Sequence, residues 1–142
     1  AAVEHLTAVL AEKALGDAGI FADAEPAMRD LWQWHSVEEM EHKAVAFDVY
    51  RAIGGTEKMR RAAMRRSTLF LTWDILHGVR HILKCDGKLW SPKIWLSGVR
   101  FLFGQQGILR GTWAPYKAFF DQDFHPWQED TSELIAQWQL QQ

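Results

Sequence analysis

Three side chains that can bind a metal ion lie close together in the sequence, at His35, Glu39 and His42. On a helix with 100° per residue they fall within about 60° of one another, so all three point the same way. Met28 and Val49 fall beside this wedge, which predicts that the trio interrupts the stripe facing the protein core. Burial of an unpaired carboxylate and two imidazoles costs several kcal/mol, and a divalent metal bound by all three removes this cost.

The spacing Glu39-x-x-His42 is typical of ferritin-like bundles that hold two metal ions. Such a site also needs carboxylates from neighbouring helices to bridge the ions. Glu4, in the first predicted helix, shares a face with the small residues Thr7 and Ala11, which leave space beside its carboxylate. Glu4 is therefore the expected fourth ligand. The opposing interpretation is a helical binding module in which the His/Glu trio forms only a hydrogen-bonded network of the core.

Other polar residues near this trio are expected to have lesser roles. Glu38 is a reserve ligand or a side chain that orients a ligand. Glu41 and Lys43 are expected to face solvent, and Glu12 is expected on the surface. His5 is expected on the helix surface or next to a ligand, and not as a ligand itself.

Breaks between segments of helical periodicity predict the elements that position these residues. Helices are expected over 1–15, 26–53, 57–84, 92–103 and 108–120, with a last short one from Thr131 towards the C-terminus. Pro115 is expected to kink or shorten its helix, positions 104–107 to form a hinge, and positions 121–130 to be irregular. No segment alternates polar and apolar residues like a strand. The predicted fold class is all-α: a helical bundle with a ferritin-like half-site, followed by amphipathic aromatic-rich helices.

Length and composition fit one ordinary globular domain over residues 1–142. There are 16 Lys and Arg against 18 Asp and Glu, a net charge of −2, and these charges are interpreted as evenly mixed. No overall field would then attract nucleic acid or an anionic membrane.

The single cysteine, Cys85, excludes a disulfide scaffold and a Cys-based zinc cluster, and it fits a reducing, cytoplasmic location. The apolar stretch 69–83 is interrupted by charges and falls short of a membrane span.

Two further features of the second half have alternative interpretations. Asp74, His77 and His81 have metal-ligand spacing on one helix face. No second carboxylate helix pairs with them, so they are not expected to bind metal. The Lys and Arg cluster over 58–66 is expected to be a solvated face, with a basic helix lying on a membrane surface as the alternative.

Large aromatic residues are concentrated in the second half of the chain. They are expected to form core and the wall of a pocket suited to an apolar small-molecule substrate, because no basic stripe interleaves them. These residues are Trp73, Trp90, Trp95, Phe101, Phe103, Trp113, Phe119 and Phe120. Near the C-terminus, His125 and Trp127 are expected to pin the tail against the bundle.

The run WHSVEEMEHKAVAFDVYRAIGG, with EHLTAVLAE before it and FLFGQQGILR and DFHPWQEDT after it, resembles the predicted metal-dependent hydrolases, a ferritin-like group of longer proteins. The resemblance covers essentially the whole chain as the C-terminal half of such a protein, in which two earlier helices supply a Glu and a Glu-x-x-His. It implies that Glu4 is the carboxylate of the third ligand helix and that Glu39 and His42 are the pair of the fourth. With His35 added, the pattern is similar to the diiron arylamine N-oxygenases, where a histidine four residues before the Glu is a ligand.

One Glu and one Glu-x-x-His make half of a dimetal site. The chain is therefore expected to be a fragment that lacks N-terminal helices, or to pair with a homodimer mate about a two-fold axis. Positions 1–55 are expected to form the metal-ligand helix pair and 56–142 the packing helices and tail. The face that bears Glu4, His35, Glu38, Glu39 and His42 is expected to be exposed or intermolecular in the isolated chain.

The expected function is that of a metal-dependent hydrolase or a dimetal oxygenase acting on an apolar small molecule. Ligands that offer oxygen and nitrogen without thiolate suit iron first, with manganese or zinc as alternatives. The competing function is a non-catalytic helical binding or interaction module, with peripheral contact to a membrane as one form of it. The choice between hydrolysis and oxidation, and the substrate, stay open at this point.

Overall fold

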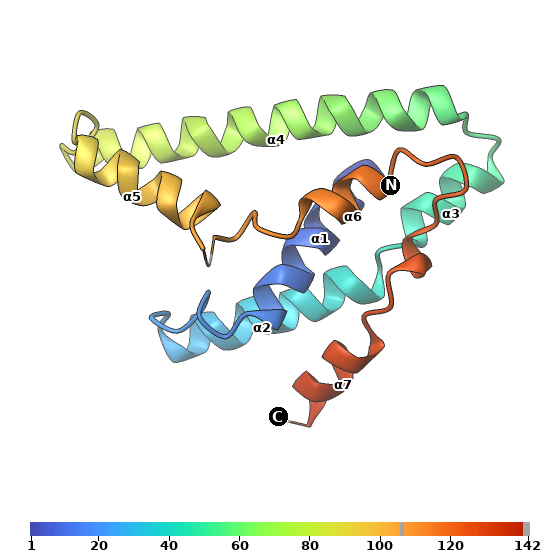
Figure 1. Ribbon diagram of the computed structural model, residues 1–142, viewed down its shortest axis with the longest axis horizontal. Coiled ribbons are helices and arrows are strands. Elements are labelled where there is room, and N and C mark those ends of the chain that lie inside the picture. Colours follow the sequence, from blue (N-terminus) through green and yellow to red (C-terminus); the bar gives the residue numbers. More distant parts are fainter. Residues whose placement is uncertain (106, 141–142) are drawn as a thin grey trace.

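The computed structural model describes residues 1–105 and 107–140, which form an arrangement of helices around a central one (Figure 1). The elements are α1 (Ala2–Gly16), α2 (Pro26–Glu41), α3 (Val45–Ala52), α4 (Glu57–Cys85), α5 (Pro92–Phe103), α6 (Trp113–Ala118), the 3-10 helix η1 (Pro126–Gln128) and α7 (Ser132–Gln139). No strand occurs in this described part of the chain. The all-α fold class predicted from the sequence is confirmed.

The central helix is α1, which packs against α2 and also contacts α4, α6 and α7 (Figure 1). Its buried alanines lack long side chains and so allow neighbouring helices to approach closely. One core cluster consists of Ala2, Phe47, Met64, Phe119 and Phe124. The other consists of Ala11, Val37 and Met40. The two clusters hold α2, α3 and the start of α4 around α1.

Several helix boundaries follow from capping residues that the sequence reveals. The Glu25 side chain accepts a hydrogen bond from the Met28 amide, and Pro26 occupies the first turn of α2. Thr56 accepts a hydrogen bond from the Met59 amide at the start of α4. The predicted helices over 57–84 and 92–103 therefore match α4 and α5 closely.

The prediction of one continuous helix over 26–53 is wrong, because α2 ends at Glu41 and α3 begins at Val45. Between them, Lys43 is buried, and its ammonium group donates to the carbonyl of Glu129 and to the hydroxyl of Thr131. The expectation that Lys43 faces solvent is therefore also wrong. The helix breaks where this side chain is drawn towards the C-terminal segment.

The predicted helix over 108–120 is reduced to the six residues of α6. Pro115 lies in its first turns, where a missing amide proton is tolerated. Gly111, with a φ of 85°, ends the turns that precede it, a conformation that glycine adopts without steric cost. The predicted hinge over 104–107 includes position 106, and the predicted last helix extends towards positions 141–142. These three positions lie outside the described residues.

Most of the aromatic residues expected in the core are exposed. Trp73, Trp90, Phe101, Phe103 and Trp113 have exposed fractions between 58% and 87%. For the first four, the reason is that α4 contacts the core only near its beginning, while its remainder and α5 extend along one side of the molecule (Figure 1). Trp113 lies on α6 and lines an apolar pocket between α1 and α4. In the part of the chain that the structure describes, no helix meets the length and apolarity required for a membrane span.

Candidate metal centre

All four predicted ligands line one hollow on the molecular surface. Glu4 comes from α1, His35 and Glu39 come from α2, and His42 is the residue that ends α2. Glu38 lines the same hollow, which has a volume of about 440 Å³ and is open to solvent. The helical spacing thus brings together the donors that the sequence predicted.

The Glu39 carboxylate contacts Thr7 and His35, which line the same hollow. The Thr7 hydroxyl donates to Glu39 Oε2 at 2.5 Å. On the other side, His35 Nε2 lies 3.5 Å from Glu39 Oε1. His35 and Glu39 are four residues apart on α2, the spacing at which side chains on one helix face meet. The small side chain of Thr7 leaves room for this contact between α1 and α2, as expected for a residue beside Glu4.

Glu4 makes a different interaction from the one its role as a ligand requires. Its carboxylate accepts hydrogen bonds from the amide of Ala46, at 3.1 Å for Oε2 and 3.3 Å for Oε1. Ala46 lies in the first turn of α3, where backbone N–H groups have no partner within the helix. The negative charge of Glu4 therefore stabilises the N-terminus of α3.

These donors fit a divalent metal by type and by location, because carboxylate oxygens and imidazole nitrogens are ligands of iron, manganese and zinc. The directions of the side chains do not yet form a coordination shell. Among residues 1–105 and 107–140, no three His, Cys, Asp or Glu side chains are placed to hold one ion. Both oxygens of the Glu4 carboxylate are engaged by the Ala46 amide, whereas Thr7 contacts only one oxygen of Glu39.

The hollow is open to solvent, with His35 and His42 exposed and Glu4, Glu38 and Glu39 half-buried. The His35 side chain is 48% exposed, Met28 and Leu31 on the same helix are 47% and 51% exposed, and Val49, on α3, is 58% exposed. The buried residues of α2 are instead Ser36, Val37 and Met40. The expectation that the ligand trio interrupts a core-facing stripe is wrong, because the apolar residues beside the trio do not face the core.

His5 lies on another side of α1 and has a structural role. It is buried, its Nε2 lies 3.0 Å from the carbonyl of Pro115, and its ring centroid lies 5.0 Å from those of Phe119 and Phe124. Burial lowers the pKa of His5, the hydrogen bond with the Pro115 carbonyl partly opposes this, and the nearby charges of Lys43 and Arg60 lower the pKa further. The expectation of a surface histidine or of one beside a ligand is wrong, because His5 is buried against Pro115. The periodicity of a sequence does not reveal a contact with a residue so far along the chain.

The charges of Lys43, Glu12 and Glu129 influence one another, which the sequence does not reveal. Glu12 was expected on the surface, but partial burial raises its pKa, the charge of Glu129 raises it further, and the opposing charge of Lys43 lowers it. Desolvation lowers the pKa of Lys43, which Glu12 and Glu129 partly oppose. Lys43 also lies over the ring of Trp127, at 5.2 Å from its centroid. These residues join α1 and the α2–α3 break to the C-terminal segment.

Arg60 is the other buried cation and was expected to belong to a solvated basic face. It is 2% exposed and donates to the carbonyls of Phe119 and Asp121. Its Nη2 also lies 2.5 Å from Glu57 Oε2, and the bonds from Arg60 lower the pKa of Glu57. The sequence signal for this role is the spacing of Glu57 and Arg60, which places them on one helix face.

His125 behaves as expected. Its Nε2 lies 2.9 Å from Asp48 Oδ1, and its ring packs against Phe47, so the residue does pin the tail to α3. Asp74, His77 and His81 are exposed on α4, and the expectation that they do not bind metal stays a prediction.

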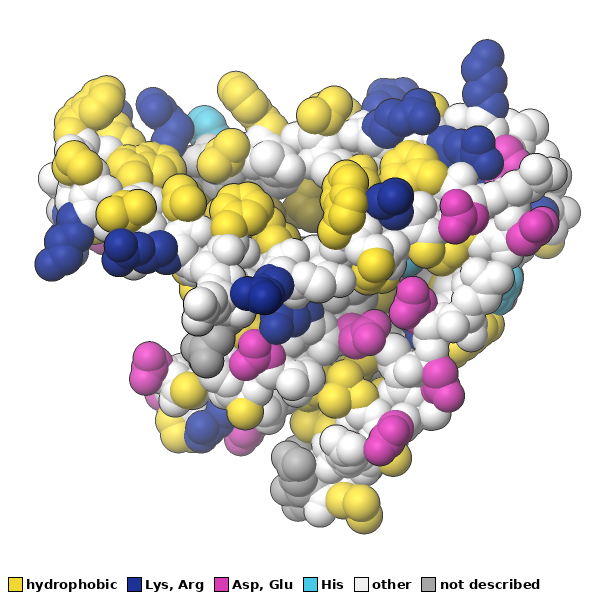
Figure 2. Space-filling view, viewed as in Figure 1, with side chains coloured by type: hydrophobic (Ala, Val, Ile, Leu, Met, Phe, Trp, Pro, Cys, Tyr) yellow, Lys and Arg dark blue, Asp and Glu magenta, His cyan; other side chains and the backbone are white. Residues whose placement is uncertain are grey.

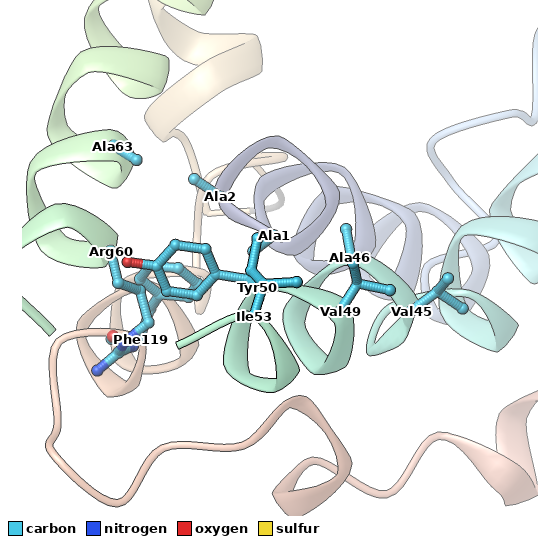
Figure 3. A pocket seen from close by; sticks show the side chains of 10 residues that line it. All are labelled: Ala1, Ala2, Val45, Ala46, Val49, Tyr50, Ile53, Arg60, Ala63 and Phe119. Carbon is cyan, nitrogen blue, oxygen red and sulfur yellow. Dashed lines mark hydrogen bonds between the residues drawn. The ribbon is translucent and has the colours of Figure 1, made fainter. Parts of the chain in front are cut away.

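An apolar pocket lies next to the hollow and shares Ala1 with it (Figure 3). Its volume is about 510 Å³, and it is bounded by the beginning of α1, by α3 and by α4. Val45, Val49 and Ile53 supply one wall, whereas Phe119 lies at its end with Arg60. Tyr50 also lines it, and its hydroxyl donates to the carbonyl of Thr56.

Comparison with known proteins gives one assignment. Residues 1–130 match the model of a family described as predicted metal-dependent hydrolase. No curated protein and no solved structure matches the chain significantly. The family model covers more than half of the chain and includes every residue of the hollow. The chain therefore belongs to the family of predicted metal-dependent hydrolases.

Proposed function

We propose that this chain carries half of the metal site of a hydrolase, with Glu4, His35, Glu39 and His42 as ligands in the hollow between α1 and α2. The observation that carries the proposal is that all four side chains line one hollow, although they come from two helices and a helix end. A divalent metal bound there would lower the pKa of a bound water molecule and supply a nucleophile for hydrolysis.

The chain's own residues have separate tasks in this proposal. Thr7 orients Glu39 by donating to one of its oxygens, which leaves the other oxygen directed towards His35. Glu38 lines the hollow and is the carboxylate assigned to accept a proton from the attacking water. Glu4 turns from the Ala46 amide into the hollow when the ion binds.

The half-site needs further ligands to hold two ions. One Glu and one Glu-x-x-His correspond to half of the ligands of a ferritin-like dimetal bundle. We infer that the other half comes from a further segment of the same protein or from a second copy of this chain. The exposed Met28 and Leu31 beside the hollow support this inference, because an apolar rim around a polar site is typical of a covered surface.

The adjoining pocket supports an apolar substrate. Valine, isoleucine, alanine and aromatic side chains line it, and it reaches the hollow at Ala1. A substrate bound in this pocket would place one end beside the ligands, while its apolar part is held against α3. Iron is the first choice of metal for this mixed carboxylate and imidazole set, with manganese or zinc as alternatives.

Metal titration tests the proposal. Anaerobic titration of the full chain with iron(II), and separately with manganese(II) and zinc(II), is expected to show saturable binding that His42→Ala and Glu39→Gln abolish. His81→Ala is the matched control, because His81 lies on α4, away from the hollow, and this variant is expected to bind like the unmodified chain. Equal binding by His42→Ala and the unmodified chain would contradict the ligand assignment.

The mass of the metal-bound species distinguishes the sources of the missing ligands. If a second copy completes the site, ion binding is expected to convert the chain into a dimer. If a further segment completes it, a longer form of the protein is expected to bind two ions as a monomer. Two ions bound by one monomeric copy of residues 1–142 would show that the site has been assigned wrongly. Oxygen consumption by the iron(II) form would replace hydrolysis by oxidation as the function.

A further inference from the structure

Charge is unevenly distributed between two parts of the molecule. We call residues 57–103, which comprise α4, α5 and the turn between them, the α4–α5 arm. The arm contains ten Lys and Arg but three Asp and Glu, whereas the rest of the chain contains six Lys and Arg and fifteen Asp and Glu. The expectation that the charges are evenly mixed is therefore wrong, because the α4–α5 arm is basic and the rest of the chain is acidic. Figure 2 shows basic and apolar side chains along the edge formed by α4, with most acidic side chains below it.

One face of α4 combines these basic residues with large apolar ones. Over positions 66–84, eight residues lie within about 60° of Trp73 at 100° per residue, and we call them the α4 stripe. They are Arg66, Leu69, Phe70, Trp73, Leu76, His77, Arg80 and Lys84. Every one is exposed, including Leu69 at 72% and Trp73 at 68%. Asp74, about 100° from Trp73, lies outside the stripe, which therefore contains no carboxylate.

Most of the stripe faces away from the rest of the molecule, although Leu76, at one edge of the stripe, lines an apolar pocket shared with α1. Met64, Thr68 and Leu71 lie on the opposite side of α4, where Met64 belongs to the core and the Thr68 hydroxyl contacts Tyr116. Leu71 lines an apolar pocket shared with α1. The core therefore occupies one side of α4, and Phe70 and Trp73 point to the other.

We propose that the α4 stripe docks on the surface of a membrane that contains anionic lipids. Trp73, Phe70 and Leu69 would enter the boundary between headgroups and acyl chains, where amphipathic helices bury their apolar residues. Arg66, Arg80 and Lys84 would reach lipid phosphates, and their aliphatic stems would cover apolar surface. This proposal goes beyond the metal site and does not depend on it.

The expectation that no basic stripe interleaves the aromatic residues is wrong for α4, because Arg66 and Arg80 lie seven residues before and after Trp73 on the same face. This interleaving favours lipid over a protein partner. A protein interface would desolvate Lys84, and lysine is depleted in interface cores. A second copy of the stripe would bring Arg66, Arg80 and Lys84 against the same cations, which is unfavourable. Nucleic acid would bind the cations, but it would leave Leu69 with no apolar partner.

The acidic remainder of the chain would set the orientation of the docked molecule. An anionic surface attracts the α4–α5 arm and repels the carboxylates of α2, such as Glu38 and Glu39. Because α1 separates α4 from α2, the hollow would face away from the lipid (Figure 1). Docking would thus leave the candidate metal centre accessible from the aqueous side.

Vesicle sedimentation tests the proposal with the full chain. The chain is expected to sediment with phosphatidylcholine vesicles that contain about one third phosphatidylserine, to stay in solution with phosphatidylcholine alone, and to be released by salt. The double variant Arg80→Glu with Lys84→Glu is expected to bind more than about thirtyfold more weakly, since loss of two basic residues near the surface alone weakens binding by about this factor and the new carboxylates are repelled. The matched control is Arg110→Glu with Lys117→Glu, two exposed cations outside the arm, which is expected to bind as before.

The contribution of the aromatic residues to vesicle binding is tested separately, because charge substitutions alone do not show that apolar side chains enter the membrane. Trp73→Ser is expected to weaken vesicle binding and to remove most of the blue shift of tryptophan fluorescence, whereas Trp34→Ser on α2 leaves both effects in place. Circular dichroism shows whether each variant keeps its helices. Equal binding to vesicles with and without phosphatidylserine, or binding to duplex DNA in place of vesicles, would overturn the proposal. Self-association lost in the Trp73→Ser variant, without vesicle binding by the unmodified chain, would also overturn it and assign the stripe to a dimer interface.

Discussion

The Glu4 carboxylate accepts hydrogen bonds from the Ala46 amide and thereby connects α1 to the first turn of α3. The same carboxylate lines the candidate metal centre, so one side chain has two competing partners. In the absence of an ion, the partial positive charge at the N-terminus of α3 holds the carboxylate. Ion binding in the hollow would therefore release this end of α3, which links the candidate site to the position of that helix.

Substitutions of Glu4 separate its two roles. Glu4→Ala is expected to lower the free energy of unfolding by about 1 kcal/mol with chelator present, because the α3 N-terminus loses its acceptor. Glu4→Gln keeps an acceptor oxygen and is expected to lose less. Both variants are expected to lose the stabilisation that added metal gives. Urea unfolding with chelator and with iron(II) measures both effects, and metal stabilisation that persists in Glu4→Gln would exclude Glu4 as a ligand.

Metal binding is expected to raise the melting temperature of the unmodified chain. An ion that binds only the folded state stabilises it by about 2.7 kcal/mol at a free concentration one hundred times the dissociation constant. His42→Ala is expected to remove this rise, because the variant lacks the imidazole at the end of α2. The control variant His81→Ala is expected to keep it. An equal rise in both variants would mean that the ion binds elsewhere.

The sequence reveals those parts of the fold and of the site that depend on local spacing. Thr56 and Pro92 define the starts of α4 and α5, and the i, i+4 and i+7 positions of His35, Glu39 and His42 bring them to one hollow. These features depend on neighbouring residues along one helix. They were therefore predictable without any knowledge of the tertiary structure.

The parts that the sequence does not reveal depend on contacts between distant positions. Lys43 breaks the predicted long helix because it bonds to Glu129 and Thr131, which follow it by more than eighty positions. The break also frees the Ala46 amide, which then binds Glu4. Apolar periodicity correctly identified α4 as a helix, but it did not show that Trp73 lies on the outward side. Burial depends on what packs against a face, and periodicity shows only that the face exists.

Arg60 is expected to be among the most important polar residues for stability. It is enclosed by Phe47, Phe119 and Phe124, with its guanidinium carbon 4.8 Å from the centroid of Phe119. Arg60→Ala leaves two carbonyls without a donor and creates a cavity, which is expected to cost about 3–5 kcal/mol. Arg66→Ala, on the exposed face of the same helix, is expected to change stability by less than about 0.5 kcal/mol. Urea unfolding of the two variants checks this difference.

His5 is expected to make stability depend on pH near neutrality. Because burial lowers its pKa in the folded state, the unfolded chain binds a proton more readily than the folded chain below about pH 6.5. The free energy of unfolding is therefore unaffected by His5 above this pH and falls as the pH is lowered through the interval between the two pKa values. Lys43 and Arg60 act in the same direction, since their charges also disfavour the protonated imidazole.

A comparison with His5→Gln isolates this effect, because glutamine does not titrate and its amide can donate to the carbonyl of Pro115. Unfolding in urea at a series of pH values from 7.5 to about 5 is expected to show a steeper loss for the unmodified chain than for the variant. The carboxylates, including Glu12 and Glu57, are present in both proteins, so their titration cancels in the difference. Parallel curves over this range would show that His5 is protonated equally in the folded and unfolded chains. Burial of the imidazole would then not control its ionisation.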